Sequence, residues 1–176
     1  DRIRSRGLGD VYKRQLGITA GVAAYKTPAL VRALRAAGAE IQVVMSTNAK
    51  RFVTLTALQA VSGQPVRDDL WDAQAEATMG HIELARWADQ ILIAPATANC
   101  IAALAQGQAY DLLTTMCLAT EAQVVVAPAM NQRMYLHAAT QQNLSALERL
   151  GYQIIDPDHG EQLSLIHISE PTRPNT

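Results

Sequence analysis

The chain has 176 residues, of which 49% are apolar, 18% are charged and 5% are aromatic, and its formal net charge is -1. This length and apolar content suit one domain with a buried core, and they exclude a disordered or collagen-like chain. The near-zero charge excludes charge-driven binding to nucleic acid, so we expect no nucleic-acid partner.

Other functional classes are excluded by single features. Two cysteines, Cys100 and Cys117, are too few for a disulfide scaffold or a four-cysteine zinc site, and we expect no metal. No apolar run is long enough to span a membrane, and no signal peptide opens the chain. These features favour a cytoplasmic protein without a membrane partner.

The two ends of the chain lack the hydrophobic periodicity found between them. Residues 1–15 carry five basic and two acidic side chains, and residues 163–176 are equally unpatterned. One DNA duplex encodes residues 5–15 on one strand and 163–173 on the other, and it resembles the transposon-end adapters of sequencing libraries. We therefore predict that both ends are translated adapter without regular structure; a basic arm and a polar tail are the alternative. Residues 16–162 then form the domain, truncated at both ends, with a net charge of -4.

Between the ends, short apolar runs alternate with helical patterns, which is typical of βαβ units around a parallel sheet. The predicted strands are 16–18, 41–45, 90–95, 124–128 and 152–155. The predicted helices are 21–37, 54–61, 82–88, 97–105, 111–119 and 137–150. Pro28 interrupts the first helical pattern, so either that helix kinks or its first turn is irregular. Strands made almost only of Val and Ile indicate helices on both faces, and we predict an α/β, Rossmann-like (flavodoxin-like) doubly wound parallel sheet.

Ligands of such a sheet bind beyond the carboxyl ends of its strands, and four of these ends carry small or polar residues. The four turns are 19–23, 46–48, 94–99 and 127–134. Small residues in the first turn allow backbone N–H groups to approach a phosphate, although an ordinary tight turn explains them equally well. Hydroxyl and amide groups in the second turn suit phosphate or ribityl oxygens, although N-capping by Ser46 or Thr47 explains them better.

The third turn makes a polar-lined bend suited to the edge of a flat ligand. In the fourth turn Asn131 lies between Met130 and Met134, and a carboxamide in an apolar setting needs a partner. His81 lies between Gly80 and an apolar helix, where a structural or surface histidine is the better explanation for the residue by itself. No spacing of residues indicates hydrolysis or a metal site.

Taken together, these segments resemble the homo-oligomeric flavin-containing Cys decarboxylases. The resemblance depends on 17–26 (GITAGVAAYK), 80–84 (GHIEL), 94–99 (APATAN) and the PxMNxxM pattern of 128–134, and it covers 16–162. Within the family the pattern most resembles the enzymes that convert 4'-phosphopantothenoylcysteine to 4'-phosphopantetheine in coenzyme A biosynthesis. The resemblance implies a domain that binds FMN between the subunits of a homotrimer, with trimers sometimes assembled into a dodecamer.

The resemblance also implies roles for the residues at matching positions. His81 is implied to be the active-site base, and Asn131 is implied to bind the substrate carboxylate. The residues implied to hold FMN are Ala20, Gly21, Val22, Ser46, Asn48, Thr97, Ala98, Asn99, Cys100 and Ala129. In the family the flavin oxidises the cysteine thiol to a thioaldehyde, which accepts the electrons left behind by CO2. His81 would assist proton removal, and Asn131 would hold the carboxylate without a full positive charge that favours the ground state.

A flap follows this domain in the family and carries a cysteine that protonates and helps to reduce the ene-thiol product. Residues 156–162 reach the start of that region, and neither Cys100 nor Cys117 lies at a matching position. We therefore expect oxidative decarboxylation but poor completion of the cycle. The alternatives are a peptidyl-cysteine decarboxylase of the same family, which stops at the ene-thiol, and a non-enzymatic flavin-binding regulatory subunit.

Overall fold

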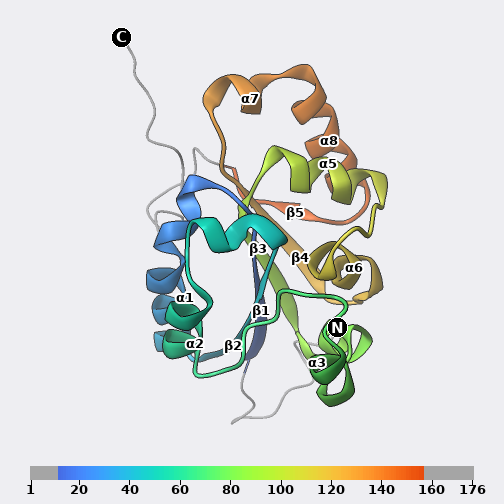
Figure 1. Ribbon diagram of the computed structural model, residues 1–176. Helices are drawn as coiled ribbons and strands as arrows, with labels where there is room; N and C mark the ends of the chain where they lie inside the picture. Colours follow the sequence, from blue (N-terminus) through green and yellow to red (C-terminus); the bar gives the residue numbers. More distant parts are fainter. Residues whose placement is uncertain (1–11, 157–176) are drawn as a thin grey trace.

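The computed structural model describes residues 12–156 of the chain and contains a five-stranded sheet (Figure 1). The strands are β1 (Tyr12–Ile18), β2 (Ala39–Met45), β3 (Gln90–Ala96), β4 (Gln123–Pro128) and β5 (Gln153–Ile154). All neighbours pair in parallel, in the order β2-β1-β3-β4-β5. The direction of the order reverses between β1 and β3, which confirms the predicted flavodoxin-like doubly wound sheet.

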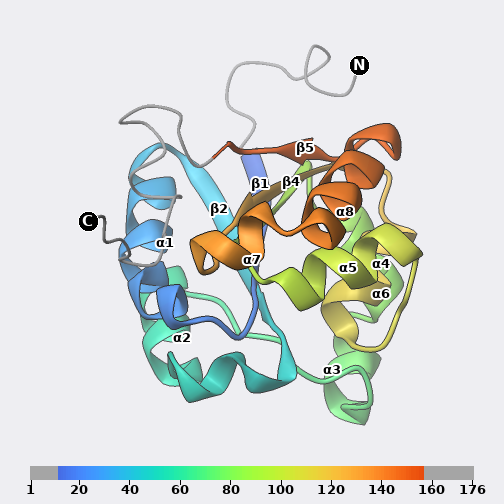
Figure 2. The same ribbon diagram turned by 90° about the horizontal axis from the view of Figure 1, so that it is seen from above.

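Helices cover both faces of the sheet, as predicted. The α-helices are α1 (Thr27–Ala36), α2 (Leu55–Ser62), α3 (Ala73–Thr78), α4 (His81–Trp87), α5 (Ala98–Gln106), α6 (Leu112–Ala119), α7 (Gln132–Leu136) and α8 (Ala138–Arg149). Two short 3-10 helices, η1 (Val22–Lys26) and η2 (Thr47–Arg51), follow β1 and β2. Helices α1 and α2 lie on one face, and α4, α5, α6 and α8 lie on the other (Figures 1 and 2). None of the helices within residues 12–156 is long and apolar enough to cross a membrane.

The buried strands supply two hydrophobic cores, one on each face of the sheet. Ile91 and Ile93 of β3 pack with residues of α4, α5, α6 and α8. Leu92 and Ala94 of the same strand pack with residues of α1 and α2. Because successive side chains of a strand point to opposite faces, a strand covered on both sides must be apolar throughout.

Each predicted helix and strand has a counterpart, but the helix predicted over 21–37 is divided. Its first turns form η1, and α1 begins at Thr27 with Pro28 in the first turn. Proline is tolerated there because the N–H that it lacks would have no partner within the helix. The first turns are therefore irregular, and the helix does not kink. The short helices η2, α3 and α7 were not predicted, because five or six residues show too little periodicity.

The start of β1 corrects the prediction that residues 1–15 have no regular structure. Residues 12–15 pair in register with β2. The backbone N–H of Lys13 also donates to an Asp89 carboxylate oxygen at 2.8 Å, and Gln15 Nε2 donates to the Leu84 carbonyl at 2.7 Å. An extended segment that continues a central strand satisfies its backbone groups on both sides, whatever its side-chain pattern. The rest of the two predicted adapter segments, and residues 157–162, lie outside the described residues.

Gly17 lies where α6 packs directly on β1. A Cβ at this position would be 2.5 Å from Leu113 Cδ1 and 3.0 Å from Leu113 Cδ2. Leu113 is fully buried, so its side chain has little room to move away.

We therefore expect Gly17→Ala to lower the free energy of unfolding by about 1–3 kcal/mol through overpacking. Urea unfolding without added cofactor measures this change. Gly21→Ala is the matched control, because its Cβ would be 3.6 Å from Thr97 Cγ2, an ordinary contact. Equal losses in the two variants would contradict the packing argument.

Candidate active site

Thr19, directly after β1, ties the first predicted turn to the third. Its hydroxyl donates to the Pro95 carbonyl at 2.7 Å and accepts from the Thr97 N–H at 3.0 Å. Thr19 is only 3% exposed, so these bonds are shielded from water. The two turns flank the point where the strand order reverses, which is where ligands bind in open α/β sheets.

The second and fourth turns join the same edge of the sheet. The Ser46 N–H donates to the Ile18 carbonyl at 2.9 Å, and the Ala129 N–H donates to the Ala96 carbonyl at 3.1 Å. Ala23 and Ala129 pack together as a small buried cluster. The structure thus brings all four predicted turns together at the carboxyl edge of the sheet, a surface that we call the turn surface.

Two helices that begin at the turn surface have no side-chain cap. Gly21 precedes η1 and Ser46 precedes η2, and neither N-terminus receives a side-chain hydrogen bond. The simpler explanation for Ser46, N-capping of the next helix, is therefore wrong. The first N–H groups of a helix have no partner within it and attract anions. By contrast, Thr97 caps α5 by accepting from the Cys100 N–H at 3.2 Å.

The predicted cofactor residues differ in their exposure. Those that are exposed or partly exposed at this edge are Ala20, Gly21, Val22, Asn48, Thr97, Ala98 and Asn99. Ser46 and Ala129 are buried at 8% and 7% exposure. The Cys100 side chain is 1% exposed and packs in the core beneath α5, so only the backbone of Cys100 faces the turn.

Asn131 is exposed, so the apolar setting expected for its carboxamide is wrong. Its Oδ1 accepts from the Arg133 N–H at 2.8 Å and caps α7, and the nearby Met134 is 49% exposed. This bond occupies the acceptor end of the carboxamide. The NH2 group remains as a donor that can bind an anionic group.

His81 is the first residue of α4 and lies outside the four turns in sequence. Its Nδ1 lies 2.9 Å from Glu76 Oε1. The ring borders a pocket of about 400 Å³ whose other lining residues are Leu70, Trp71, Asp72, Ala73, Glu76 and Thr115. None of these residues belongs to the four turns, and both views show α3 apart from α7 (Figures 1 and 2). We call the surface around His81 the histidine surface; the residues that line its pocket come from outside the four turns.

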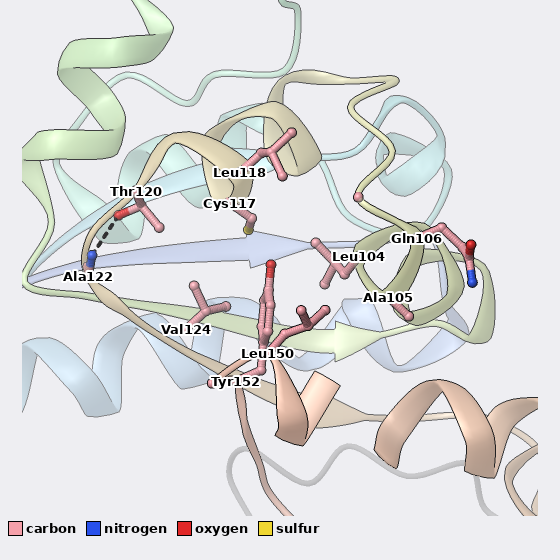
Figure 3. A pocket seen from close by; sticks show the side chains of 12 residues that line it. Leu104, Ala105, Gln106, Cys117, Leu118, Thr120, Ala122, Val124, Leu150 and Tyr152 are labelled. Atoms are coloured by element: carbon pink, nitrogen blue, oxygen red, sulfur yellow. Dashed lines mark hydrogen bonds between the residues drawn. The ribbon is translucent and has the colours of Figure 1, made fainter. Parts of the chain in front are cut away.

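Another pocket, of about 460 Å³, contains no predicted site residue. It is lined by residues of α5 and α6, by Val124 of β4, and by the segments that precede β4 and β5. Figure 3 shows the Tyr152 hydroxyl pointing toward Cys117, beside Val124 and Leu150. Within residues 12–156, no three His, Cys, Asp or Glu side chains are grouped as metal ligands.

Both cysteines are buried thiols. Burial, with a smaller contribution from the charge of Asp111, raises the pKa of Cys100 to about 12. Burial also raises the pKa of Cys117 well above its ordinary value. The same cause raises the pKa values of Tyr110 and Tyr152 to about 12. A buried thiol that stays protonated is a poor nucleophile, so neither cysteine is suited to covalent chemistry.

These raised pKa values predict a loss of stability at alkaline pH. Cysteine and tyrosine ordinarily ionise near 9.0 and 10.0, so above these values the unfolded chain releases protons that the folded chain retains. We expect the free energy of unfolding in urea to be constant near pH 8 and to fall between about pH 9 and about pH 12.

Tyr152→Phe is the matched variant, because it keeps the ring and removes the ionising hydroxyl. It should make the alkaline decline shallower while leaving the m-value unchanged. A decline as steep as that of the unsubstituted chain would show that Tyr152 ionises normally in the folded state.

Comparison with known proteins identifies the family. The model of the family described as "Flavoprotein" matches residues 7–170. The chain belongs to the Flavoprotein family. It is 58% identical over 147 residues to the coenzyme A biosynthesis bifunctional protein CoaBC of Vibrio vulnificus, a match that covers 84% of this chain. The chain spans 37% of the length of that relative.

Solved structures of flavin-containing Cys decarboxylases share the fold. SpaF, an FMN-dependent cysteine decarboxylase, is 34% identical with a TM-score of 0.78, and the match covers 88% of each chain. A PPC decarboxylase mutant complexed with pantothenoylaminoethenethiol is 28% identical with a TM-score of 0.71, over 84% of this chain and 83% of that one. These matches confirm the resemblance inferred from the sequence motifs.

Two residues that organise these surfaces were not among the predicted site residues. The sequence does not distinguish Thr19 from the other small residues of its turn, and it gives Glu76 no role. The only signal for Thr19 was a hydroxyl directly after a strand. The only sequence signal for Glu76 is a carboxylate five positions before a histidine, and this spacing is common by chance.

Proposed function

We propose that this chain binds FMN and decarboxylates 4'-phosphopantothenoylcysteine on the route to 4'-phosphopantetheine in coenzyme A biosynthesis, in the cytoplasm. The observation that carries the proposal is the turn surface, where two uncapped N-termini and the Asn131 amide lie at the carboxyl edge of the sheet, on strands beside the reversal of strand order. The identity to CoaBC and the ligand of the PPC decarboxylase mutant support this substrate.

The residues of the turn surface fit FMN. The free N–H groups after Gly21 and Ser46 suit its phosphate, and the small residues around them leave room for it. Thr97, Ala98 and Asn99 offer a narrow, polar edge for the flavin ring, and Ala129 closes the surface from the fourth turn. When bound, FMN supplies the electron acceptor for oxidation of the substrate thiol.

The chain's own residues then hold the substrate and move its proton. The Asn131 amide donates to the substrate carboxylate without adding a positive charge, so it orients the group without stabilising the anion that must be lost. His81 accepts a proton as the thiol-bearing carbon is oxidised. Neither step uses Cys100 or Cys117, whose thiols are buried.

We also propose a homotrimer, with assembly of trimers into a dodecamer, as the form in which the site is complete. The histidine surface carries the exposed apolar side chains of Trp71 and Ile82, at 85% and 43% exposure. Val22 of the turn surface and Tyr25, further along η1, are also exposed apolar side chains, at 52% and 59%. Exposed apolar groups at both places favour contact between copies, and a head-to-tail contact would bring His81 of one chain to the turns of the next.

Mixing two inactive variants tests this shared site. We expect His81→Gln and Asn131→Ala each to abolish most activity. Unfolding and refolding them together in equal amounts should restore about a quarter of it, because one site in four then receives both native residues. No recovery in mixed trimers, shown by mass spectrometry of differently tagged chains, would mean that both residues act within one chain.

A purified chain incubated with FMN tests the cofactor and the substrate. We expect a yellow protein that retains FMN through gel filtration and releases CO2 from phosphopantothenoylcysteine. It should process a cysteine-ended peptide at least tenfold less well, because a peptide lacks the phosphopantothenoyl group.

The other outcomes correspond to the alternatives. Preference for the peptide would indicate a peptidyl-cysteine decarboxylase, and bound FMN without turnover would indicate a regulatory subunit. A colourless chain that does not bind FMN would rule out the flavoprotein function. Mass spectrometry of the product separates the ene-thiol from phosphopantetheine, and we expect mainly the ene-thiol.

A further inference from the structure

Glu76, in α3, contacts His81 through both oxygens of its carboxylate. Its Oε1 lies 2.9 Å from the imidazole Nδ1, and its Oε2 accepts from the His81 backbone N–H at 3.2 Å. A carboxylate only accepts hydrogen bonds, so in the neutral ring this contact places the proton on Nδ1 and leaves the lone pair on Nε2. We infer that Glu76 is a positioning residue that fixes the ring and the tautomer of His81, so that Nε2 is the atom that receives the substrate proton. This inference rests on the proposed function of His81.

Arg67 forms an ion pair with the Glu76 carboxylate, without a hydrogen bond between them. Its Nη2 lies 3.8 Å from Glu76 Oε2, and its Nη1 donates to the Met79 carbonyl. The Arg67 backbone is itself fixed to β2, because its N–H donates to Val43 and its carbonyl accepts from Met45, at 3.0 and 2.8 Å. Its side chain is only 11% exposed. The orientation of His81 is thereby connected to the edge strand of the sheet through two successive side chains.

Gly80 provides the space that this arrangement needs. A Cβ at this position would lie 2.8 Å from Glu76 Oε1, closer than real Cβ atoms come to an oxygen. The φ angle of Gly80 is -66°, which any residue can adopt, so the backbone conformation does not require glycine. A side chain at this position would instead displace the Glu76 carboxylate, which is the end of a flexible side chain, from its contact with His81. Gly80 thus leaves room for the Glu76 oxygen that lies against the His81 ring.

The His81 side chain remains 32% exposed, so the ring is oriented by Glu76 but still open to a substrate or a neighbouring chain. Holding one ring nitrogen while leaving the other free is how carboxylates orient catalytic histidines in general. The pair is complete within one chain and does not depend on FMN.

The tautomer of His81 can be measured directly in the chain without FMN. With ¹⁵N-labelled histidine, two-bond ¹H–¹⁵N spectra at about pH 8.5, where an ordinary imidazole is neutral, distinguish a protonated Nδ1 from a protonated Nε2. The His81→Gln variant identifies the signal. We expect the Nδ1–H form in the unsubstituted chain and a shift toward the Nε2–H form in Glu76→Ala and Gly80→Ala.

Matched variants separate positioning from general loss of structure. Glu76→Gln keeps one acceptor oxygen and should retain more of the Nδ1–H form than Glu76→Ala. Glu83→Gln removes an exposed carboxylate from the first turn of the same helix and should leave the spectrum unchanged. In the active protein, Glu76→Ala should lower kcat about 10- to 100-fold with KM nearly unchanged, because substrate binding does not involve Glu76.

An Nε2–H tautomer of His81 in the unsubstituted chain would overturn the inference, whether or not any variant folds. So would an unchanged kcat in a folded Glu76→Ala variant. If the chain shows the expected tautomer but no turnover of any cysteine substrate, the proposed function fails while the geometry of the pair is upheld. If turnover is normal but the tautomer is wrong, the proposed function is upheld and Glu76 has no positioning role.

Discussion

The buried hydroxyl of Thr19 joins the ends of the two strands between which the order of the sheet reverses. It donates to the Pro95 carbonyl and accepts from the Thr97 N–H, so one side chain satisfies backbone groups of the third turn from the first. An unpaired polar group at this depth would cost about 1–3 kcal/mol, which makes any separation of the two turns unfavourable. The relative position of Gly21 and Thr97, and with it the shape of the turn surface, depends on this contact.

The sheet was predictable from the sequence because its strands are covered on both faces and are therefore apolar throughout. The predicted strand positions also gave the carboxyl ends of the strands. The four turns that follow these ends could therefore be predicted as the ligand-binding edge. The contact of Thr19 was not predictable, because it requires knowing that β1 and β3 are neighbours, and they are separated by more than seventy residues. The same limit applies to residues 12–15, which pair because they continue β1 and not because of their side-chain pattern.

The environments of individual site residues were harder to predict than their places in the chain. Asn131 follows a buried strand and lies between methionines, yet it is exposed because the chain turns into α7 directly after it. Cys100 is next to exposed Asn99 in sequence but points into the core, because α5 begins at the turn and presents every third or fourth residue to the sheet. Sequence position made both residues candidates, and the helix that starts beside each one determines which way its side chain points.

In the proposed assembly, each folded chain supplies two half-sites, the turn surface and the histidine surface. Each half-site is completed by a half-site of a neighbouring chain. Each half is nonetheless fixed before association: Thr19 sets the turn surface, and Glu76, placed by Arg67 and given room by Gly80, sets His81. Association then has to bring together two rigid surfaces without ordering either of them, which lowers the entropic cost of forming the site. Activity in such a protein depends on chain concentration through the trimer, while the orientation of the base does not. In the proposed assembly, the geometry of each reacting group is set within one chain, and the contact between chains brings the groups together.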